Sequence, residues 1–262
     1  MNLRGWDYTG RNIGPEFHRQ LFTIFRNLSD PVFVNGRSWG TLFQEELAAK
    51  VGLSSSGAIR TIKRLCDNFG FLNKAAFSGP IQCDQILSKR GASIFNIAEI
   101  EDQLENDLNI SHEKRERAEA AIKALYEEIY CEALLNYTVM VRGKAFSPLR
   151  ATLRALEKYS AMDKWEWYLL NTCVSCNDDP DEEALLDSYI TKYRNGKISF
   201  TMNDVVKKPK GHQYTPQHFD FAGLVSLVQR PEWRITGSTQ HQEIKQQALS
   251  DEFINKIKSG VF

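Results

Sequence analysis

The chain has 262 residues, of which 42% are hydrophobic, and its 33 Lys and Arg residues balance 33 Asp and Glu residues. This length and apolar content suit a globular protein of one large or two ordinary domains, and no apolar run nears the roughly 18 residues that span a bilayer, which excludes an integral membrane protein. A secretory signal is absent and five scattered cysteines make no disulfide framework, so we expect a cytoplasmic protein.

The charge is distributed unevenly. Residues 1–98 carry 12 Lys and Arg against 7 Asp and Glu, residues 99–135 carry 4 against 11, and residues 136–262 carry 17 against 15, for net charges of +5, −7 and +2. An acidic connector between two more basic blocks is compatible with nucleic-acid binding, because the surface that faces phosphates is local and the average over a chain hides it.

The N-terminal residues 1–13 combine arginines and aromatic side chains with two glycines. Such a segment is either a disordered tail or an arm that carries Arg and aromatic groups into a DNA groove. The candidate arm residues are Arg4, Trp6, Tyr8 and Arg11. Residues 15–28 then have an apolar stripe and a proline suited to the first turn, which predicts an amphipathic helix.

Residues 41–72 predict two short helices joined by a tight turn. Thr41 and Gln44 have the spacing of a capping box, and Gly52 ends the first apolar run. The second helix has one apolar face and one face rich in hydrogen-bond donors, ended by Gly70. Helix-turn-helix proteins place such a second helix in the DNA major groove. The candidate contacts to bases and phosphates are Ser54, Ser55, Ser56, Arg60, Lys63 and Arg64.

The surroundings of these helices favour a winged helix. Residues 32–34 are compatible with a short strand, residues 71–87 with a small hairpin, and residues 88–100 with a closing helix. Three helices, a hairpin and a closing helix are the order of a winged helix. We therefore predict a mainly α (α+β) protein with a winged-helix DNA-binding subdomain at residues 14–100.

Residues 101–140 predict a linker that contains a long helix beginning near Ser111. Its apolar stripe is short, so a coiled-coil dimer is a minor alternative. Residues 141–262 predict helices after Ser147, after Ser160 and from Asp181, another from Pro216, and a late strand, WRIT. The order resembles the first subdomain, so we predict a second, more diverged winged-helix subdomain.

One polar, basic segment of this second subdomain is a candidate to bind the DNA backbone or a second part of the groove. Its candidate residues are Lys207, Lys208, Lys210, His212, Gln213 and Tyr214.

Signals for catalysis and metal binding are weak. A metal-dependent nuclease needs carboxylates grouped on adjoining strands, whereas the acids of residues 178–183 lie at a helix start, where the helix dipole favours them. Cys173 and Cys176 form a lone Cys-x-x-Cys, with only His212 and His218 at loose spacing in the same subdomain, which favours a pair of partly buried thiols over zinc. We predict neither catalytic residues nor a bound metal in this chain.

With these elements placed, the chain resembles the N-terminal recognition domain of type II restriction endonucleases that cut outside their site, of the BpuJI type. The resemblance rests on QEELAAKVGLSSSGAIRTIKRLCDNFGFL, on the linking helix, and on the stretch from FSPLRATLRALEKY to RPEWRIT. It implies a monomeric module that reads an asymmetric duplex site, while a separate C-terminal nuclease domain of the parent protein cuts with Mg²⁺. The alternatives are a winged-helix transcriptional regulator or phage DNA-binding protein, and a protein-interaction scaffold.

Overall fold

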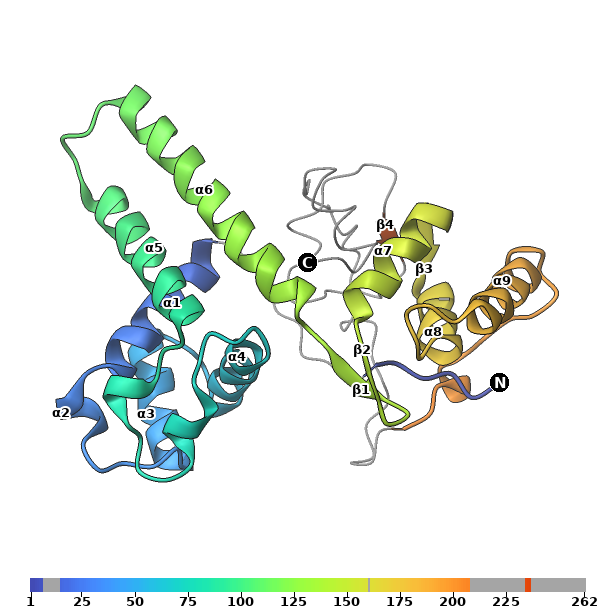
Figure 1. Cartoon of the computed structure of the whole chain (residues 1–262), viewed down its shortest axis with the longest axis horizontal. Coiled ribbons are helices and arrows are strands. Elements are labelled where there is room, and N and C mark those ends of the chain that lie inside the picture. The colour runs from blue at the N-terminus through green and yellow to red at the C-terminus, as the bar shows by residue number, and fades with distance from the viewer. Residues whose placement is uncertain (7–14, 160, 208–233, 237–262) are drawn as a thin grey trace. The chain divides into compact units, whose positions relative to one another are not determined.

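The computed structural model describes residues 1–6, 15–159, 161–207 and 234–236. The chain is mainly helical, as the sequence predicts, and it divides into two compact units (Figure 1). The N-terminal unit is Ile13–Leu134, and the composite unit combines Met1–Asn12 with Leu135–Phe262. In the part of the chain that the structure describes, no helix has the length and apolarity needed to cross a bilayer.

These boundaries differ from the expected ones. The first six residues belong to the composite unit and are no separate arm, and nearly all of the long helix belongs to the N-terminal unit and is no free linker. The N-terminal unit contains α1 (Pro15–Leu28), α2 (Pro31–Val34), α3 (Thr41–Val51), α4 (Ser56–Asn68), η1 (Lys74–Phe77), η2 (Cys83–Gln85), α5 (Lys89–Asn106) and α6 (His112–Leu135).

Helix α1 forms the centre of the N-terminal unit. Its predicted apolar stripe is confirmed, since Phe17, Leu21, Ile24, Phe25 and Leu28 are all at most 4% exposed. The helix packs against α3 and α5, and the second half of α6 also turns its apolar face inward. Burial of these side chains gives the unit a core of its own. The buried residues of α6 are Ile122, Tyr126, Tyr130, Ala133 and Leu134.

The strand expected at residues 32–34 is wrong, because that segment forms the helical turn α2. The side chain of Asp30 accepts a hydrogen bond from the backbone N–H of Val32, and Pro31 occupies the first turn. An Asx cap followed by proline favours a helix start over a strand.

The hairpin expected at residues 71–87 is reduced to a single antiparallel bridge between Leu72 and Leu87. The intervening residues form the short helices η1 and η2, and the Asn73 side chain caps η1 by accepting from the N–H of Ala75. A second bridge joins Ser38 to Pro80. A regular wing is therefore missing from this segment, and the winged-helix geometry is not established.

The described elements of the composite unit begin with a hairpin that the sequence did not reveal. Strands β1 (Val139–Val141) and β2 (Lys144–Phe146) pair antiparallel, with Arg142 and Gly143 at the turn, where φ is 50° and 81°. The helices expected after Ser147, after Ser160 and from Asp181 are confirmed, and they begin at Pro148, Lys164 and Pro180. The elements are β1 (Val139–Val141), β2 (Lys144–Phe146), α7 (Pro148–Tyr159), β3 (Ala161–Asp163), α8 (Lys164–Cys173), α9 (Pro180–Arg194), η3 (Met202–Asp204) and β4 (Arg234–Thr236).

The late strand in WRIT is also confirmed. It is β4, which pairs in parallel with β3, so that Met162 faces Ile235 in the register. Among the described residues the hairpin precedes the three helices, whereas a wing follows them, so the predicted second winged helix is not supported by the element order. The helix expected from Pro216 lies outside the described residues.

Candidate nucleic-acid interface

The α3–α4 pair forms because glycine and serine separate two apolar helices. Gly52 ends α3 with a left-handed φ of 73°, and its N–H donates to the carbonyls of Ala48 and Ala49. Helix α4 begins after Ser55, whose extended backbone leads the chain into the second helix. The capping box expected at Thr41 is wrong: Gly40 occupies the N-cap, and Gln44 is buried with its amide donating to the carbonyl of Trp39.

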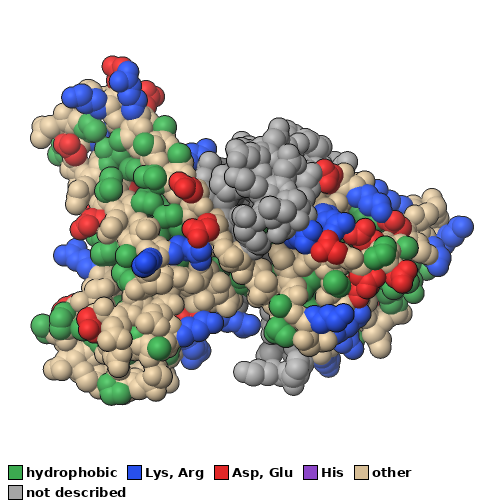
Figure 2. Space-filling model, viewed as in Figure 1, with side chains coloured by type: hydrophobic (Ala, Val, Ile, Leu, Met, Phe, Trp, Pro, Cys, Tyr) green, Lys and Arg blue, Asp and Glu red, His purple; other side chains and the backbone are tan. Residues whose placement is uncertain are grey.

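Helix α4 turns one polar face outward from its unit. Ile59, Ile62 and Leu65 are at most 1% exposed, whereas Arg60 and Arg64 are exposed on the opposite side. Lys and Arg side chains are visible over and beside α4 (Figure 2). Residues at spacings of three and four lie on one face of a helix, so the outward face comprises Gly57, Arg60, Thr61, Arg64 and Asn68.

Among the residues of α4 itself, the outward face carries no acid. The only acid of α4 is Asp67, and its carboxylate accepts from Lys63 Nζ at 2.8 Å on the flank of the helix. The hydroxyl of the half-buried Thr61 donates to the carbonyl of Gly57 at 3.0 Å. The exposed face therefore presents two guanidinium groups with small polar neighbours.

Lys63 does not belong to the open face, unlike the sequence prediction. Its side chain is 15% exposed, and its ammonium group lies 4.2 Å from the ring centroid of Phe77 and 5.5 Å from that of Trp39. Trp39 and Phe77 meet edge to face at 5.5 Å. Cation–π contacts of Lys63 thus connect α4 to the loop before α3 and to η1, and its ion pair with Asp67 lies within α4.

The serine candidates lie at the N-terminal end of α4. Ser54 and Ser55 are exposed, and Ser56 is half-buried as the first residue of the helix. The Ser55 hydroxyl makes no capping hydrogen bond to the first turn. The first backbone N–H groups of a helix have no partner within the helix, so this end can offer donors to an anion.

Arg90 helps to position α4, and the sequence pattern did not reveal this role. Its guanidinium donates to the carbonyl of Phe69 at the end of α4 (Nη1···O 2.9 Å) and pairs with Glu132 of α6 (Nη2···Oε1 2.6 Å). These partners are 21 and 42 residues away in the sequence. No local spacing signals such a contact, although it fixes the C-terminal end of α4.

The candidate arm is corrected by the structure at Trp6. This side chain is 2% exposed and packs on Phe146 and Trp167 at centroid distances of 4.9 and 6.2 Å, so it is a core residue. Arg4 is exposed, but its backbone N–H donates to Thr172 Oγ1, which holds the segment on α8. Tyr8 and Arg11 lie outside the described residues.

Of the basic segment, only Lys207 is described, and it is exposed. The remaining candidates lie outside the described residues: Lys208, Lys210, His212, Gln213 and Tyr214.

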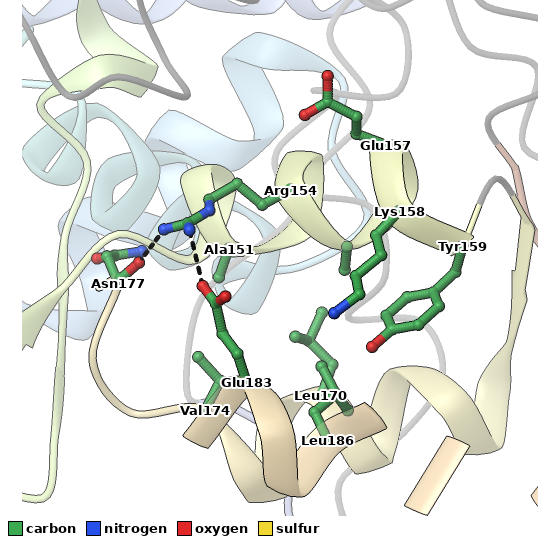
Figure 3. A pocket seen from close by; sticks show the side chains of 11 residues that line it. Ala151, Arg154, Glu157, Lys158, Tyr159, Leu170, Val174, Asn177, Glu183 and Leu186 are labelled. Atoms are coloured by element: carbon green, nitrogen blue, oxygen red, sulfur yellow. Dashed lines mark hydrogen bonds and ion pairs between the residues drawn. The ribbon is translucent and has the colours of Figure 1, made fainter. Parts of the chain in front are cut away.

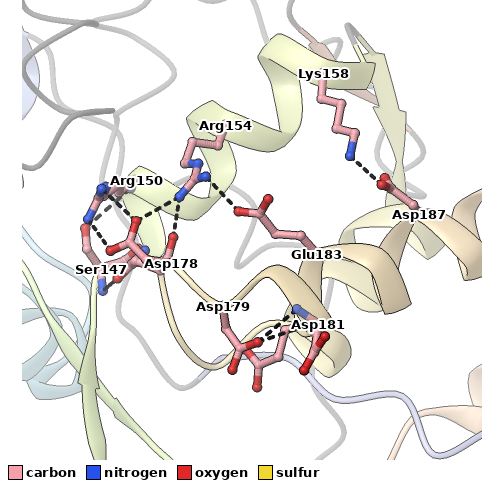
Figure 4. A network of polar contacts seen from close by, with 11 residues as sticks. Ser147, Arg150, Arg154, Lys158, Asp178, Asp179, Asp181, Glu183 and Asp187 are labelled. Carbon is pink, nitrogen blue, oxygen red and sulfur yellow. Dashed lines mark hydrogen bonds and ion pairs between the residues drawn. The ribbon is translucent and has the colours of Figure 1, made fainter.

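A second cationic stripe, on α7, is neutralised within the composite unit. Arg150, Arg154 and Lys158 lie one turn apart and face acids just before and along α9 (Figure 4). Arg150 makes a bidentate pair with Asp178, with distances of 2.9 and 3.0 Å. Arg154 pairs with Asp178 and Glu183, and Lys158 pairs with Asp187.

This ladder gives the α9 acids structural roles, as the sequence predicts. Burial raises the pKa of Asp187, but hydrogen bonds from Lys158 and Tyr159 outweigh it and hold that pKa below its usual value. Asp179 caps α9 by accepting from the N–H groups of Asp181 and Glu182. A cavity of about 190 Å³ lies beside the ladder, where Arg154 and Lys158 reach from α7 toward α9 (Figure 3). The two cations that line this cavity, Arg154 and Lys158, are already paired with acids.

The Cys-x-x-Cys pair shows no arrangement of metal ligands. Cys173 is buried, and burial raises the pKa of its thiol to about 11, while Cys176 is half-buried. Among the described residues, no three His, Cys, Asp or Glu side chains are grouped closely enough to hold a metal ion. His212 and His218 lie outside those residues.

The outward face of α4, with Arg60 and Arg64, is therefore the candidate interface that the described residues provide. No protein-family model, curated protein or solved structure matches this chain.

Proposed function

We propose that this chain binds double-stranded DNA sequence-specifically through α4, as a non-catalytic reading module. The observation that carries the proposal is that Arg60 and Arg64 are both exposed on α4, the second helix of the packed α3–α4 pair. Arg recognises guanine through two hydrogen bonds in the major groove, and Thr and Asn suit other base edges. The neighbouring Thr61 and Asn68 supply those side chains.

The spacing of the two arginines fits this function. Arg64 follows Arg60 by four positions in the helix, which corresponds to a rise of about 6 Å along the helix axis. Successive base pairs are about 3.4 Å apart, so the two guanidinium groups match a step of about two base pairs. Lys63 and Arg90 hold the helix by its flank and its C-terminal end, and such support is what precise groove contacts require.

The wider assignment is that the module belongs to a type II restriction endonuclease, in which a separate C-terminal nuclease domain uses Mg²⁺. Such a module binds an asymmetric site as a monomer. A winged-helix transcriptional regulator, in contrast, favours a palindromic site bound by a dimer. The symmetry of the selected sequence and the mass of the complex separate these two assignments.

The test is selection from a random duplex library, followed by binding of the selected sequence at several salt concentrations. We expect Arg60→Ala and Arg64→Ala each to weaken specific binding by about 1–3 kcal/mol and to relax the preference at one base position. Lys63→Met should leave the salt dependence unchanged, because its ammonium group is already paired with Asp67.

Arg26 provides the matched control, because it is an exposed cation on α1. Arg26→Ala should leave the selected sequence unchanged. Absence of any enriched sequence, or equal and uniform weakening by all four substitutions, contradicts reading by α4.

A further inference from the structure

The cavity beside the ion-pair ladder of the composite unit has an apolar floor and a charged rim. Its volume is about 190 Å³, and residues of α7, of α9 and of the C-terminal half of α8 line it (Figure 3). An apolar cavity of about 150 Å³ holds a benzene molecule, so this cavity has room for a small organic group. It belongs to the composite unit, whereas the proposed DNA-binding face belongs to the N-terminal unit, so the two sites can be tested independently.

The floor of the cavity is aliphatic. Two alanines of α7 leave space that longer side chains would fill, and leucine and valine side chains form the remainder. All of the floor residues are at most 6% exposed, namely Ala151, Ala155, Leu170, Val174 and Leu186. Their side chains have no hydrogen-bonding groups, so the floor suits a small aliphatic group and penalises a polar one.

Both signs of charge are present at the rim. Arg154 and Lys158 reach the cavity from α7, and Glu183 reaches it from α9 (Figure 3). Their side chains are 34%, 52% and 42% exposed, so a solute can contact them. Glu157 is the fourth charged residue of the lining, which therefore combines two cations with two acids. This balance favours a ligand that carries both charges over a simple anion or cation.

The ion pairs of the ladder leave hydrogen-bonding capacity at the rim. A Lys ammonium group has three donors, and the bond from Lys158 to Asp187 uses one of them. A carboxylate has about four acceptor sites, and Arg154 Nη2 lies 2.8 Å from Oε1 of Glu183. A small ligand can therefore bind Lys158 and Glu183 without breaking the existing pairs.

We propose that this cavity binds a zwitterionic α-amino acid with a branched aliphatic side chain, such as leucine. The carboxylate of the ligand accepts hydrogen bonds from Lys158, and its ammonium group donates to Glu183. Its side chain covers Ala155 and Leu186. Hydrogen bonds between charged groups are the strong ones, and burial of the aliphatic side chain adds to them.

The first test is isothermal titration calorimetry of the full chain with leucine and with three compounds that each lack one of its groups. Isocaproate lacks the ammonium group, isoamylamine lacks the carboxylate, and glycine lacks the side chain. We expect leucine to bind at least about tenfold more tightly than each of the three, because each loses one set of contacts.

Variants then locate the site. Lys158→Met removes the partner of the ligand carboxylate, and Ala155→Leu fills the cavity, so each should weaken leucine binding at least about tenfold. Lys192→Met is the matched control. Its ammonium group lies 5.3 Å from the ring centroid of Tyr189, much as that of Lys158 lies 5.7 Å from the ring of Tyr159, but Lys192 does not line the cavity. This control should bind leucine as the wild-type protein does.

Three results overturn the proposal. The first is the absence of binding heat with leucine, isoleucine, valine and methionine at concentrations up to about 10 mM. The second is isocaproate or isoamylamine binding as tightly as leucine. The third is leucine binding that Lys158→Met leaves unchanged, and this variant decides alone if Ala155→Leu does not fold, because Lys158 is half exposed.

Discussion

Arg4 and Trp6 lie two residues apart, but their side chains have opposite environments. Arg4 is exposed, whereas Trp6 is enclosed by Phe146 and Trp167 and donates from its indole Nε1 to the carbonyl of Val174 at 3.4 Å. Its backbone N–H also donates to the buried side chain of Asn171 at 2.6 Å. Trp6 is therefore part of the core of the composite unit.

We expect Trp6→Ala to destabilise the protein by about 3–5 kcal/mol, because removing a buried aromatic ring loses its transfer free energy and leaves a cavity. Chemical denaturation monitored by circular dichroism measures this change. Arg4→Ala should change the stability by less than about 0.5 kcal/mol, because its side chain is exposed. If Trp6→Ala were equally harmless, Trp6 would not be a core residue of the composite unit.

Single residues also show where sequence patterns stop. Helical spacing places Arg60 and Arg64 on the polar face of α4, and both are exposed. The same spacing could not reveal that Lys63 is covered, because Trp39 and Phe77 are 24 and 14 residues away in the sequence. The composition around Trp6 likewise indicates an exposed arm, because it cannot show that the partners of Trp6 in the core lie more than 130 residues further along the chain.

At the scale of elements, a glycine in the first turn of α5 lets this helix approach the backbone of Phe71 closely. A Cβ atom built on Gly91 lies 1.9 Å from the carbonyl oxygen of Phe71, far inside van der Waals contact. Ser88 caps the same helix by accepting from the N–H of Gly91 and donates to the carbonyl of Gly70. The start of α5 therefore packs closely against residues 70 and 71, which follow α4.

Gly91→Ala tests this packing. In a helix interior, alanine is ordinarily better than glycine by about 1 kcal/mol. Here we expect the opposite sign, a destabilisation of about 1–3 kcal/mol or more, because the backbone of Phe71 cannot yield without moving α4 or α5. Denaturant unfolding provides the measurement. Gly79→Ala is the control, since nothing lies within 4 Å of its Cβ position, and a stabilised Gly91→Ala variant would contradict the packing.

Whole elements were predictable where the local signals agree. Helix α1 combines an apolar stripe with a proline in the first turn, and α9 has acids in its first turn and Asn195 at its C-cap; the bounds of both match the expected ones closely. At residues 31–34, two valines suggested a strand, but Asp30 and Pro31 imposed a helical turn. The β1–β2 hairpin was missed because its turn consists of Arg142 and Gly143, and arginine rarely adopts a positive φ.

At the scale of the whole molecule, the two units do not follow the order of the chain, because one of them combines its first residues with its second half. Leu3 is fully buried and forms a parallel bridge with Val205, in which its N–H donates to Asp204 and its carbonyl accepts from Val206. The start of the chain is therefore held by residues near position 205, although Ile13–Leu134 form a separate unit between them. Contacts with such large separation in sequence are not encoded in any local pattern.

This arrangement predicts which unit responds to a mutation. Leu3→Ala should destabilise the composite unit by about 2–5 kcal/mol and leave residues 15–134 unaffected, although those residues are closer in sequence. Hydrogen exchange measured by mass spectrometry assigns the loss of protection to peptides. Faster exchange should appear in α7 and α8, with α1, α4 and α5 unchanged, and Gly91→Ala should give the reverse pattern. If both substitutions accelerate exchange in both sets of helices, the units unfold together, and the division of the chain into separate cores is wrong.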